Sequence, residues 1–229
     1  MNYDAVIIGA GPNGLSAAVE LARNGLSVCV MEAEETIGGG TRSAELTLPG
    51  FVHDLCSAIH PMAVLSPFFS NLGLSLEWVF PPAAVAHPLP DNSAAVLYPN
   101  LQQTAEGLGM DGDSWKALFS PFVLKAKQFY SEILKPIRFP HAPFLMARFG
   151  FIALRSASSL AENRFQKLHA RALFSGCAAH SMVSLKSQGS ASFGLVLALS
   201  GHAAGWPLHE CVAAAPPCRY PPARVTGSS

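Results

Sequence analysis

Charged residues are scarce in this chain of 229 residues. They make up 13% of it, and 15 Lys and Arg balance 15 Asp and Glu. This balance excludes the basic surface that nucleic-acid binding requires. Half of the residues are hydrophobic, which is enough to bury a sizeable core in one large domain or two small ones. Low charge and a positive mean hydropathy favour apolar ligands, an uncovered partner surface or contact with a membrane face.

Paired cysteines are also lacking. The five cysteines are odd in number and stand far apart, without a CxxC pair: Cys29, Cys56, Cys177, Cys211 and Cys218. The spacing indicates neither a disulfide framework nor a zinc site. A second group of residues fits no recognised metal site either, namely His202, His209, Cys211 and Cys218. We therefore expect no metal and a reducing, cytoplasmic location.

Long apolar segments of the kind that target or span membranes are not evident. Near the N-terminus Asp4 stands where a signal peptide has its basic region, and the apolar run is too short for one. Residues 187–209 carry no charge, but their glycines, serines and histidines make a poor membrane span. We expect a buried helix there.

Glycine is plentiful near the start of the chain. Residues 3–8 are apolar and rich in β-branched side chains, which predicts a buried parallel strand. A glycine turn follows at residues 9–14, and then one helix face is marked by Leu15, Ala18, Val19 and Ala22. Asn24-Gly25 is a typical helix end. A second strand is predicted at residues 26–31, directly before Glu32.

Each part of this strand, turn, helix and strand suits the binding of a dinucleotide. Gly9 permits a tight turn, Gly11 lets the backbone approach a pyrophosphate, and Gly14 lets helix and strand pack closely. The helix start, with its free N–H groups and partial positive charge, attracts phosphates. Glu32 can accept hydrogen bonds from the ribose hydroxyls and disfavours the 2′-phosphate of NADP. The residues expected to bind the cofactor here are Gly9, Gly11, Pro12, Asn13, Gly14 and Glu32.

A second glycine segment follows the second strand. Three glycines stand in succession and precede a hydroxyl and a guanidinium side chain: Gly38, Gly39, Gly40, Thr41 and Arg42. Consecutive glycines allow the backbone to lie close to a ligand. Because this segment is predicted to lie beside the first turn, we expect it to bind the same cofactor, although a flexible loop is the alternative.

From its start to about Pro207, the chain resembles the phytoene desaturase-like family of FAD-dependent oxidoreductases. The resemblance rests on residues 38–42 and continues through residues 45–54 and 56–61. It implies that FAD is the cofactor, that the glycine turn and Glu32 bind its ADP half, and that Gly38, Gly39 and Arg42 lie along the pyrophosphate and ribityl chain. Residues 53–61 would approach the flavin ring. No general base is assigned, since His53, Asp54 and His60 are equally well explained as structural polar groups.

The remaining chain is expected to form a substrate domain. Residues 74–80, 85–88 and 94–98 predict short strands of an antiparallel sheet. Helices are predicted at residues 101–108, 114–134 with a kink at Pro121, 144–160, 163–179 and 190–204. Their apolar stripes favour a plain core, and an apolar substrate tunnel is the alternative.

Basic residues punctuate these apolar helices at Arg148, Arg155, Arg164, Lys167 and Arg171. A solvated face is the simpler interpretation. The alternative is a shallow surface that contacts anionic lipid, and the chain would then be peripheral to a membrane.

The fold expected is α/β, with a Rossmann-type FAD-binding βαβ unit, a small antiparallel sheet and a mainly helical substrate domain. The domains expected are residues 1–65, 66–209 and a disordered tail at 210–229 whose proline-rich composition has no periodicity. Members of the family are about twice as long. We therefore expect a truncated or frameshifted chain in which the C-terminal half of the family fold is missing.

The function expected is that of the N-terminal portion of an FAD-dependent oxidoreductase that transfers hydride between flavin and an apolar small-molecule substrate. Two alternatives remain at this point. One is a non-catalytic truncated remnant. The other is an NAD-dependent dehydrogenase, which the glycine triplet at Gly38 disfavours.

Overall fold

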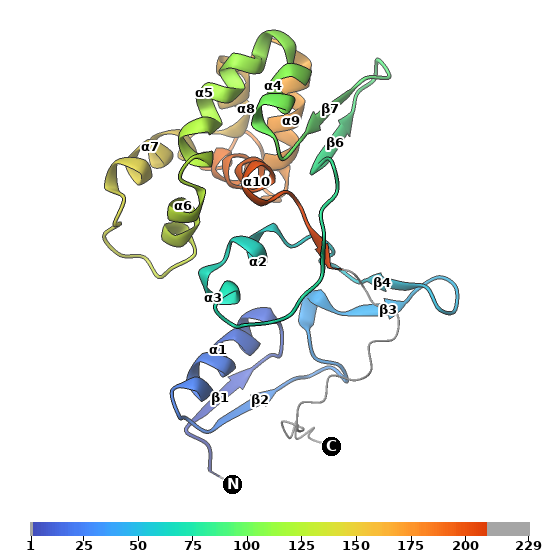
Figure 1. Cartoon of the computed structure of the whole chain (residues 1–229), viewed down its shortest axis with the longest axis vertical. Coiled ribbons are helices and arrows are strands. Elements are labelled where there is room, and N and C mark those ends of the chain that lie inside the picture. The colour runs from blue at the N-terminus through green and yellow to red at the C-terminus, as the bar shows by residue number, and fades with distance from the viewer. Residues whose placement is uncertain (1, 210–229) are drawn as a thin grey trace. The chain divides into compact units, whose positions relative to one another are not determined.

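The computed structural model describes residues 2–209 of the chain (Figure 1). These residues form two compact units, one made by residues 2–58 and the other by Ile59–His209. The expected tail at residues 210–229 lies outside the described residues. The fold is mixed α/β with a Rossmann-like unit, several small sheets and many helices, as the sequence predicts.

The first unit begins with the predicted strand, turn, helix and strand. Strand β1 (Ala5–Ile8) leads through the glycine turn into helix α1 (Pro12–Arg23), and the chain returns in strand β2 (Val28–Met31). The two strands are parallel and pair in register from Ala5 with Val28 to Ile8 with Met31 (Figure 1). Because parallel strands need a crossover, α1 packs against both of them.

Helix α1 ends as its sequence predicts. Gly25 takes the left-handed conformation with φ of +84°. The N–H of Leu26 donates to the carbonyl of Leu21 at 3.2 Å, and the N–H of Gly25 donates to that of Ala22 at 3.0 Å. This pair of bonds is a Schellman motif, which satisfies two carbonyls at the helix end.

The expectation that β1 is buried is wrong for this chain. Val6 is 56% exposed and Ile8 is 88% exposed. Within residues 2–209 the parallel sheet consists of β1 and β2 alone, so one sheet face has α1 and the other lacks a covering layer. The predicted buried face of α1 is likewise only partly buried, since Leu15 and Ala18 are half-buried and Val19 is exposed.

The rest of the first unit contains a hairpin that the sequence does not predict. After the short 3₁₀ turn η1 (Gly39–Thr41), strand β3 (Ser43–Glu45) pairs antiparallel with strand β4 (Val52–Asp54). Strands of three residues are too short to show an alternating pattern. The hairpin follows directly on the second glycine segment.

The second unit is built around helix α10 (Ala191–Ala204). It packs against strand β7 (Ala94–Leu97) and against helices α2 (Pro61–Leu65), α5 (Gly112–Val123), α7 (Pro143–Ala153), α8 (Ala157–Arg164) and α9 (Leu168–Ala179). A Cβ on Gly194 would lie 2.9 Å from the Phe174 ring, and one on Gly201 would meet the Leu97 side chain. These glycines let neighbours approach α10 closely, and the prediction of a buried, uncharged helix is confirmed.

The antiparallel sheet is only partly as predicted. Strand β6 (Val85–Pro88) pairs with β7 as a hairpin. The predicted strand at residues 74–80 is reduced to β5 (Trp78–Val79), which pairs instead with β8 (Leu208–His209). The sequence does not reveal β8 because its partner lies about 130 residues earlier, a separation that local patterns cannot report.

The helices are more numerous than predicted. Helix α4 (Leu101–Gly107) is as expected, and η2 (Gly109–Asp111) follows it. The single helix expected at residues 114–134 is two helices, α5 and α6 (Ala126–Ile133). Pro121 lies in the last turn of α5 and cannot donate to the carbonyl of Ala117. Arg148 reaches that carbonyl instead, at 3.5 Å.

Residues 144–179 also divide differently from the prediction, into α7, α8 and α9. The hydroxyl of Ser156 accepts a hydrogen bond from the N–H of Ser159 at 3.2 Å and so caps a new helix. Helices α7 and α8 meet at a bend of 96°. Ser156 is a signal for a helix start, but the apolar residues on both sides of it predicted one continuous helix at residues 144–160. Short helices α2 and α3 (Pro67–Ser70) are also unpredicted.

No single helix among residues 2–209 is long and apolar enough to cross a membrane. The bent pair of α7 and α8 meets the criteria of length and composition together.

Candidate dinucleotide-binding site

The glycine turn has the geometry that its sequence requires. Gly9 takes a left-handed backbone conformation with φ of +94°, which other residues adopt with strain. A Cβ on Gly14 would overlap the carbonyl oxygen of Gly9 and would lie 3.4 Å from the side chain of Ile7. The predicted role of Gly14 in close packing of helix and strand is therefore confirmed.

The first turn of α1 has N–H groups that the helix itself does not use. Gly11 is the N-cap residue, in an extended conformation with φ of −74°, and it has no side chain to bond to the helix start. Pro12 lies at the first helical position, where an N–H is not needed. The N–H groups of Asn13 and Gly14 have no acceptor within the helix. With no acidic residue in this turn, the helix start remains an electropositive end.

The two glycine segments predicted to act together lie against each other. The N–H of Gly38 donates to the carbonyl of Ala10 at 2.8 Å. A Cβ on Gly39 would lie only 3.0 Å from the Cα of Gly11. Two backbones that approach so closely leave no space for a side chain at Gly39. The turn and the second segment thus form one continuous surface of backbone, which we call the glycine cradle (residues 9–14 and 38–40).

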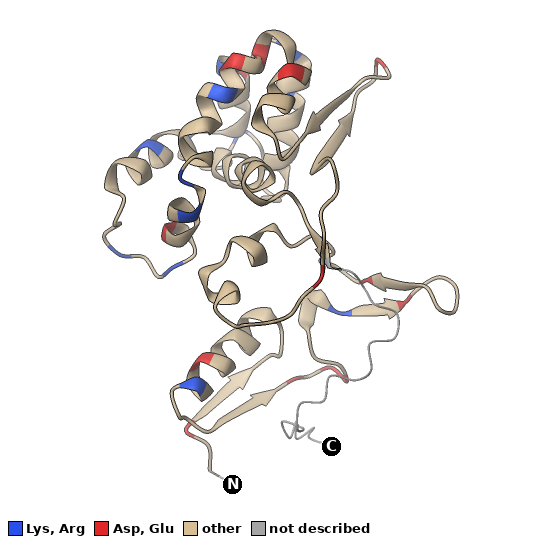
Figure 2. Cartoon of the chain, viewed as in Figure 1, with Lys and Arg blue, Asp and Glu red and all other residues tan. Residues whose placement is uncertain are grey.

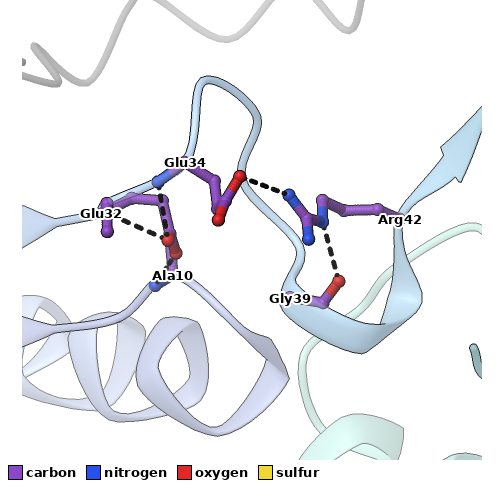
Figure 3. A network of polar contacts seen from close by, with 6 residues as sticks. Ala10, Glu32, Glu34, Gly39 and Arg42 are labelled. Atoms are coloured by element: carbon purple, nitrogen blue, oxygen red, sulfur yellow. Dashed lines mark hydrogen bonds and ion pairs between the residues drawn. The ribbon is translucent and has the colours of Figure 1, made fainter. Parts of the chain in front are cut away.

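Glu32 lies at the end of β2 and is fixed by backbone donors (Figure 3). One carboxylate oxygen accepts from the N–H of Ala10 at 2.7 Å. The other accepts from the N–H groups of Ala33 and Glu34, at 2.9 and 3.2 Å. These bonds, that of Ala10 foremost, lower the pKa of Glu32 below its ordinary 4.5. The side chain is therefore ionised at neutral pH and holds one orientation.

The carboxylate of Glu32 retains capacity for a ligand. An ionised carboxylate has about four lone-pair sites, and three are occupied by backbone N–H groups. At least one remains for a hydroxyl group. The bond to Ala10 also ties this carboxylate directly to the glycine turn, so that the acid and the cradle keep a fixed separation.

Arg42 is held beside the cradle (Figure 3). Its Nε donates to the carbonyl of Gly39 at 3.0 Å, and a terminal nitrogen lies 3.6 Å from a carboxylate oxygen of Glu34. Thr41 also bonds locally, through its hydroxyl to the carbonyl of Gly38 at 2.7 Å. Since a guanidinium has five N–H donors, Arg42 keeps donors for an anion while it stabilises the glycine segment.

Gly40 connects the cradle to residues further along the chain. Its carbonyl accepts from the N–H of Ser57 at 2.9 Å, and a Cβ on it would lie 3.7 Å from that of Cys56. Sequence reasoning missed two participants, Ala10 and Glu34. Ala10 is the buried residue between Gly9 and Gly11. Glu34 is the second acidic residue after strand β2, and its charge was a signal in the sequence for a partner of Arg42.

The polar residues of the following segment make local contacts. His53 lies 2.8 Å from the hydroxyl of Thr47 through Nε2, and Asp54 accepts from the hydroxyl of Ser43 at 2.6 Å. The ring of His60 lies beside that of Trp78, with centroids 6.0 Å apart. These contacts agree with the structural alternative and assign no general base.

The residues present suit the adenosine diphosphate half of a dinucleotide. Pyrophosphate requires backbone N–H groups at a helix start without side chains in the way, and the cradle offers both. A ribose requires an acceptor that is oriented and charged, as Glu32 is. The fit rests on glycines whose missing side chains would fill the cradle.

Comparisons with known proteins agree with this geometry. Residues 7–72 match the family model of the NAD(P)-binding Rossmann-like domain. The chain is 30% identical over 136 residues to a component of limonene dehydrogenase from Castellaniella defragrans, covering 58% of this chain and 24% of that protein. It is 34% identical over 125 residues to hydroxyneurosporene desaturase of Rhodobacter capsulatus, covering 52% of this chain and 25% of the relative.

The fold is shared with a solved oxidase. A structure of wild-type putrescine oxidase bound to putrescine matches with a TM-score of 0.54 and 21% identity, over 91% of this chain and 45% of that one. The chain thus spans about a quarter of the curated relatives it matches and less than half of the solved oxidase. Residues 7–72 thus match an NAD(P)-binding Rossmann-like domain, and the chain is similar in sequence and in fold to parts of larger oxidoreductases.

Proposed function

We propose that residues 2–58 bind FAD through its adenosine diphosphate half. The single observation that carries this proposal is the contact between the two glycine segments, with Glu32 bonded to Ala10 at their junction. The first turn of α1 would bind the pyrophosphate, and the free acceptor site of Glu32 would take a ribose hydroxyl. Arg42 would add charge beside the phosphates.

FAD, when bound, supplies a ring that accepts or returns hydride. The protein residues described here bind and orient the adenine end of such a cofactor. Glu32 holds its charge because three N–H groups stabilise the ionised form. That charge disfavours a 2′-phosphate, so the site selects FAD or NAD over NADP.

We further propose that the hydride donor or acceptor is an apolar small molecule. The second unit has an open depression of about 460 Å³, and its walls are mainly apolar: Met62, Phe193, Val196, Leu197, His180 and Ser192. The names of two relatives refer to limonene and hydroxyneurosporene, both largely hydrocarbon. Apolar walls with a few polar groups are typical of sites for such ligands.

The test is a calorimetric titration of the purified chain with FAD and with ADP. The most informative variant is Gly11→Ala. Its Cβ would lie 3.8 Å from the nearest atom, which is ordinary contact, and the φ of −74° suits alanine. The variant should fold normally yet place a methyl group where pyrophosphate approaches. We expect at least a tenfold loss of affinity for both ligands, equivalent to about 1.4 kcal/mol.

Gly150→Ala is the matched control, because its Cβ meets nothing within 4 Å in helix α7. It should bind FAD as the unmodified chain does. Equal affinity in Gly11→Ala and the control would refute the cradle as the binding site. A folded chain that binds NAD but not FAD would favour the dehydrogenase alternative.

Chemistry is tested separately from binding. The FAD-loaded chain is mixed anaerobically with limonene, and flavin absorbance is followed. Loss of the oxidised flavin band supports hydride transfer from an apolar substrate. Retention of the band with tight FAD binding would favour a non-catalytic nucleotide-binding chain.

A further inference from the structure

Residues 134–155 form a projecting part of the second unit with an apolar surface. They comprise the loop after α6, helix α7 and the two residues that follow it, and we call them the α6–α7 lobe (Figure 1). In the loop, Ile137 is fully exposed and Phe139 is 84% exposed. On the helix, Phe144 and Phe151 are 91% and 82% exposed. Four such side chains close together in sequence are unusual for a solvated surface.

Helix α7 is held by one face and leaves the other free. The inner face packs through Phe149, whose ring lies 4.9 Å from that of Phe129 and 6.2 Å from that of Phe122. Phe144 and Phe151 stand at positions i and i+7, two helical turns apart, so they share the outer face. Both faces of α7 are thus apolar, and only the inner one is explained by the core.

The loop is fastened at its base. A carboxylate oxygen of Glu132 accepts from the backbone N–H of His141 at 3.2 Å and lies 3.2 Å from its Nδ1. Pro136 and Pro140 restrict the backbone between these points. Ile137 and Phe139 are therefore presented by a constrained loop, and collapse of these side chains onto the core is not expected.

The lobe is also basic. Residues 134–155 contain four cations, Lys135, Arg138, Arg148 and Arg155, and no Asp or Glu. Among the ion pairs formed by the described residues, none involves these four. Figure 2 shows Lys and Arg along the loop and α7. The acidic residue of the preceding helix α6 is Glu132, and its carboxylate accepts the hydrogen bond from His141 at the base of the loop. Cations interleaved with exposed aromatic side chains are the composition of a surface that binds anionic lipid.

We propose that the α6–α7 lobe docks on the surface of a bilayer that contains anionic lipid. Ile137, Phe139, Phe144 and Phe151 enter the interface, while Lys135 and Arg138 meet lipid phosphates. A second copy of this chain is a poorer occupant, because a two-fold contact would bring two basic lobes together. The docking would bring the second unit to the phase in which apolar substrates dissolve.

The experiment is co-sedimentation of the full chain with vesicles of phosphatidylcholine, with and without phosphatidylserine. We expect binding to the anionic vesicles that weakens as salt increases. Lys135→Gln with Arg138→Gln, both changes at exposed or half-exposed sites, should lower the partition coefficient by about 25-fold, since each cation near such a surface contributes about fivefold. Ile137→Ser with Phe139→Ser should lower it at least tenfold.

Met110→Ser is the matched control, because Met110 is equally an exposed apolar residue but stands outside the lobe. It should bind vesicles as the unmodified chain does. Circular dichroism confirms that each variant is folded. Equal binding to neutral and anionic vesicles, or unchanged binding in both lobe variants, would overturn the proposal. So would a dimer in solution that the lobe variants dissociate while no vesicles are bound.

Discussion

The indole N–H of Trp115 donates a 2.9 Å hydrogen bond to Nε2 of His202, which lies 87 residues further along the chain. Nδ1 of the same ring lies 2.9 Å from the carbonyl of Tyr98. Because Nε2 accepts, the proton of the neutral ring is on Nδ1, which donates to that carbonyl. His202 thereby joins α5, α10 and the segment after β7 at the centre of the second unit.

This arrangement predicts a loss of stability in acid. Burial lowers the pKa of His202 from its ordinary 6.5 to about 4, against the smaller opposing effect of its backbone hydrogen bonds. The unfolded chain therefore takes up a proton at higher pH than the folded one. The free energy of unfolding should be at its full value above pH 6.5 and should fall by about 3 kcal/mol between pH 6.5 and 4. Urea titrations across this range measure it.

His202→Gln is the variant that tests the assignment. A glutamine amide can accept from Trp115 and donate to Tyr98 but does not titrate. The variant should lose most of the decrease between pH 6.5 and 4, whereas His141→Gln, at an exposed position, should retain it. An unchanged decrease in His202→Gln would assign the pH dependence to other groups.

Substitution by alanine at Gly14 and at Gly150 should change the free energy of unfolding in opposite directions. Gly14→Ala would place Cβ on the carbonyl of Gly9, so the turn must shift and the first unit should lose about 1–3 kcal/mol. Gly150→Ala meets open space in a helix and should stabilise the second unit by about 0.5–1 kcal/mol. Hydrogen exchange of the intact chain reports the two units separately. Equal effects of the two changes would contradict the packing described.

Glu32→Gln should weaken ADP binding about tenfold, because three backbone N–H groups and a ribose hydroxyl lose a charged acceptor. The same change should reduce discrimination against 2′-phosphorylated ADP. In the unmodified chain, the lowered pKa of Glu32 means that its carboxylate is still ionised when the pH has fallen from neutral to its ordinary 4.5, so the difference in affinity between the unmodified chain and Glu32→Gln should persist over this range. Calorimetric titrations with both nucleotides check these outcomes, and unchanged selectivity would speak against a ribose contact.

Gly176 and His87 should be coupled. A Cβ on Gly176 would overlap the imidazole of His87, whose Nδ1 is buried without a hydrogen-bond partner among the described residues. Gly176→Ala alone should cost about 1–3 kcal/mol of unfolding free energy. His87→Ala removes the obstruction, so the double variant should recover most of that cost. A double-mutant cycle from urea unfolding measures the coupling, and simple additivity would contradict it.

The sequence by itself determined the elements that rest on short-range rules. The strand, glycine turn, helix and strand of residues 3–31, the left-handed end at Gly25 and the uncharged helix α10 all follow from periodicity and from glycine's backbone freedom. The glycine turn and Glu32 could be named as candidate cofactor residues for the same reason, since their spacing along the chain is fixed. Residues 38–42 were named from their consecutive glycines and from the family resemblance. Family resemblance added FAD.

Only the tertiary structure decided which distant residues meet. The pairing of β5 with β8, the contact of Gly39 with Gly11 and the bond from Trp115 to His202 depend on chain closure over 28 to 130 residues, for which local patterns carry no signal. The exposure of Ile8 was likewise undetectable, because an apolar run predicts burial without showing whether a covering layer is present. The exposed face of α7 could not be predicted from the sequence either. Helix α7 is apolar on nearly all sides, so only its packing in the tertiary structure decides which face is buried.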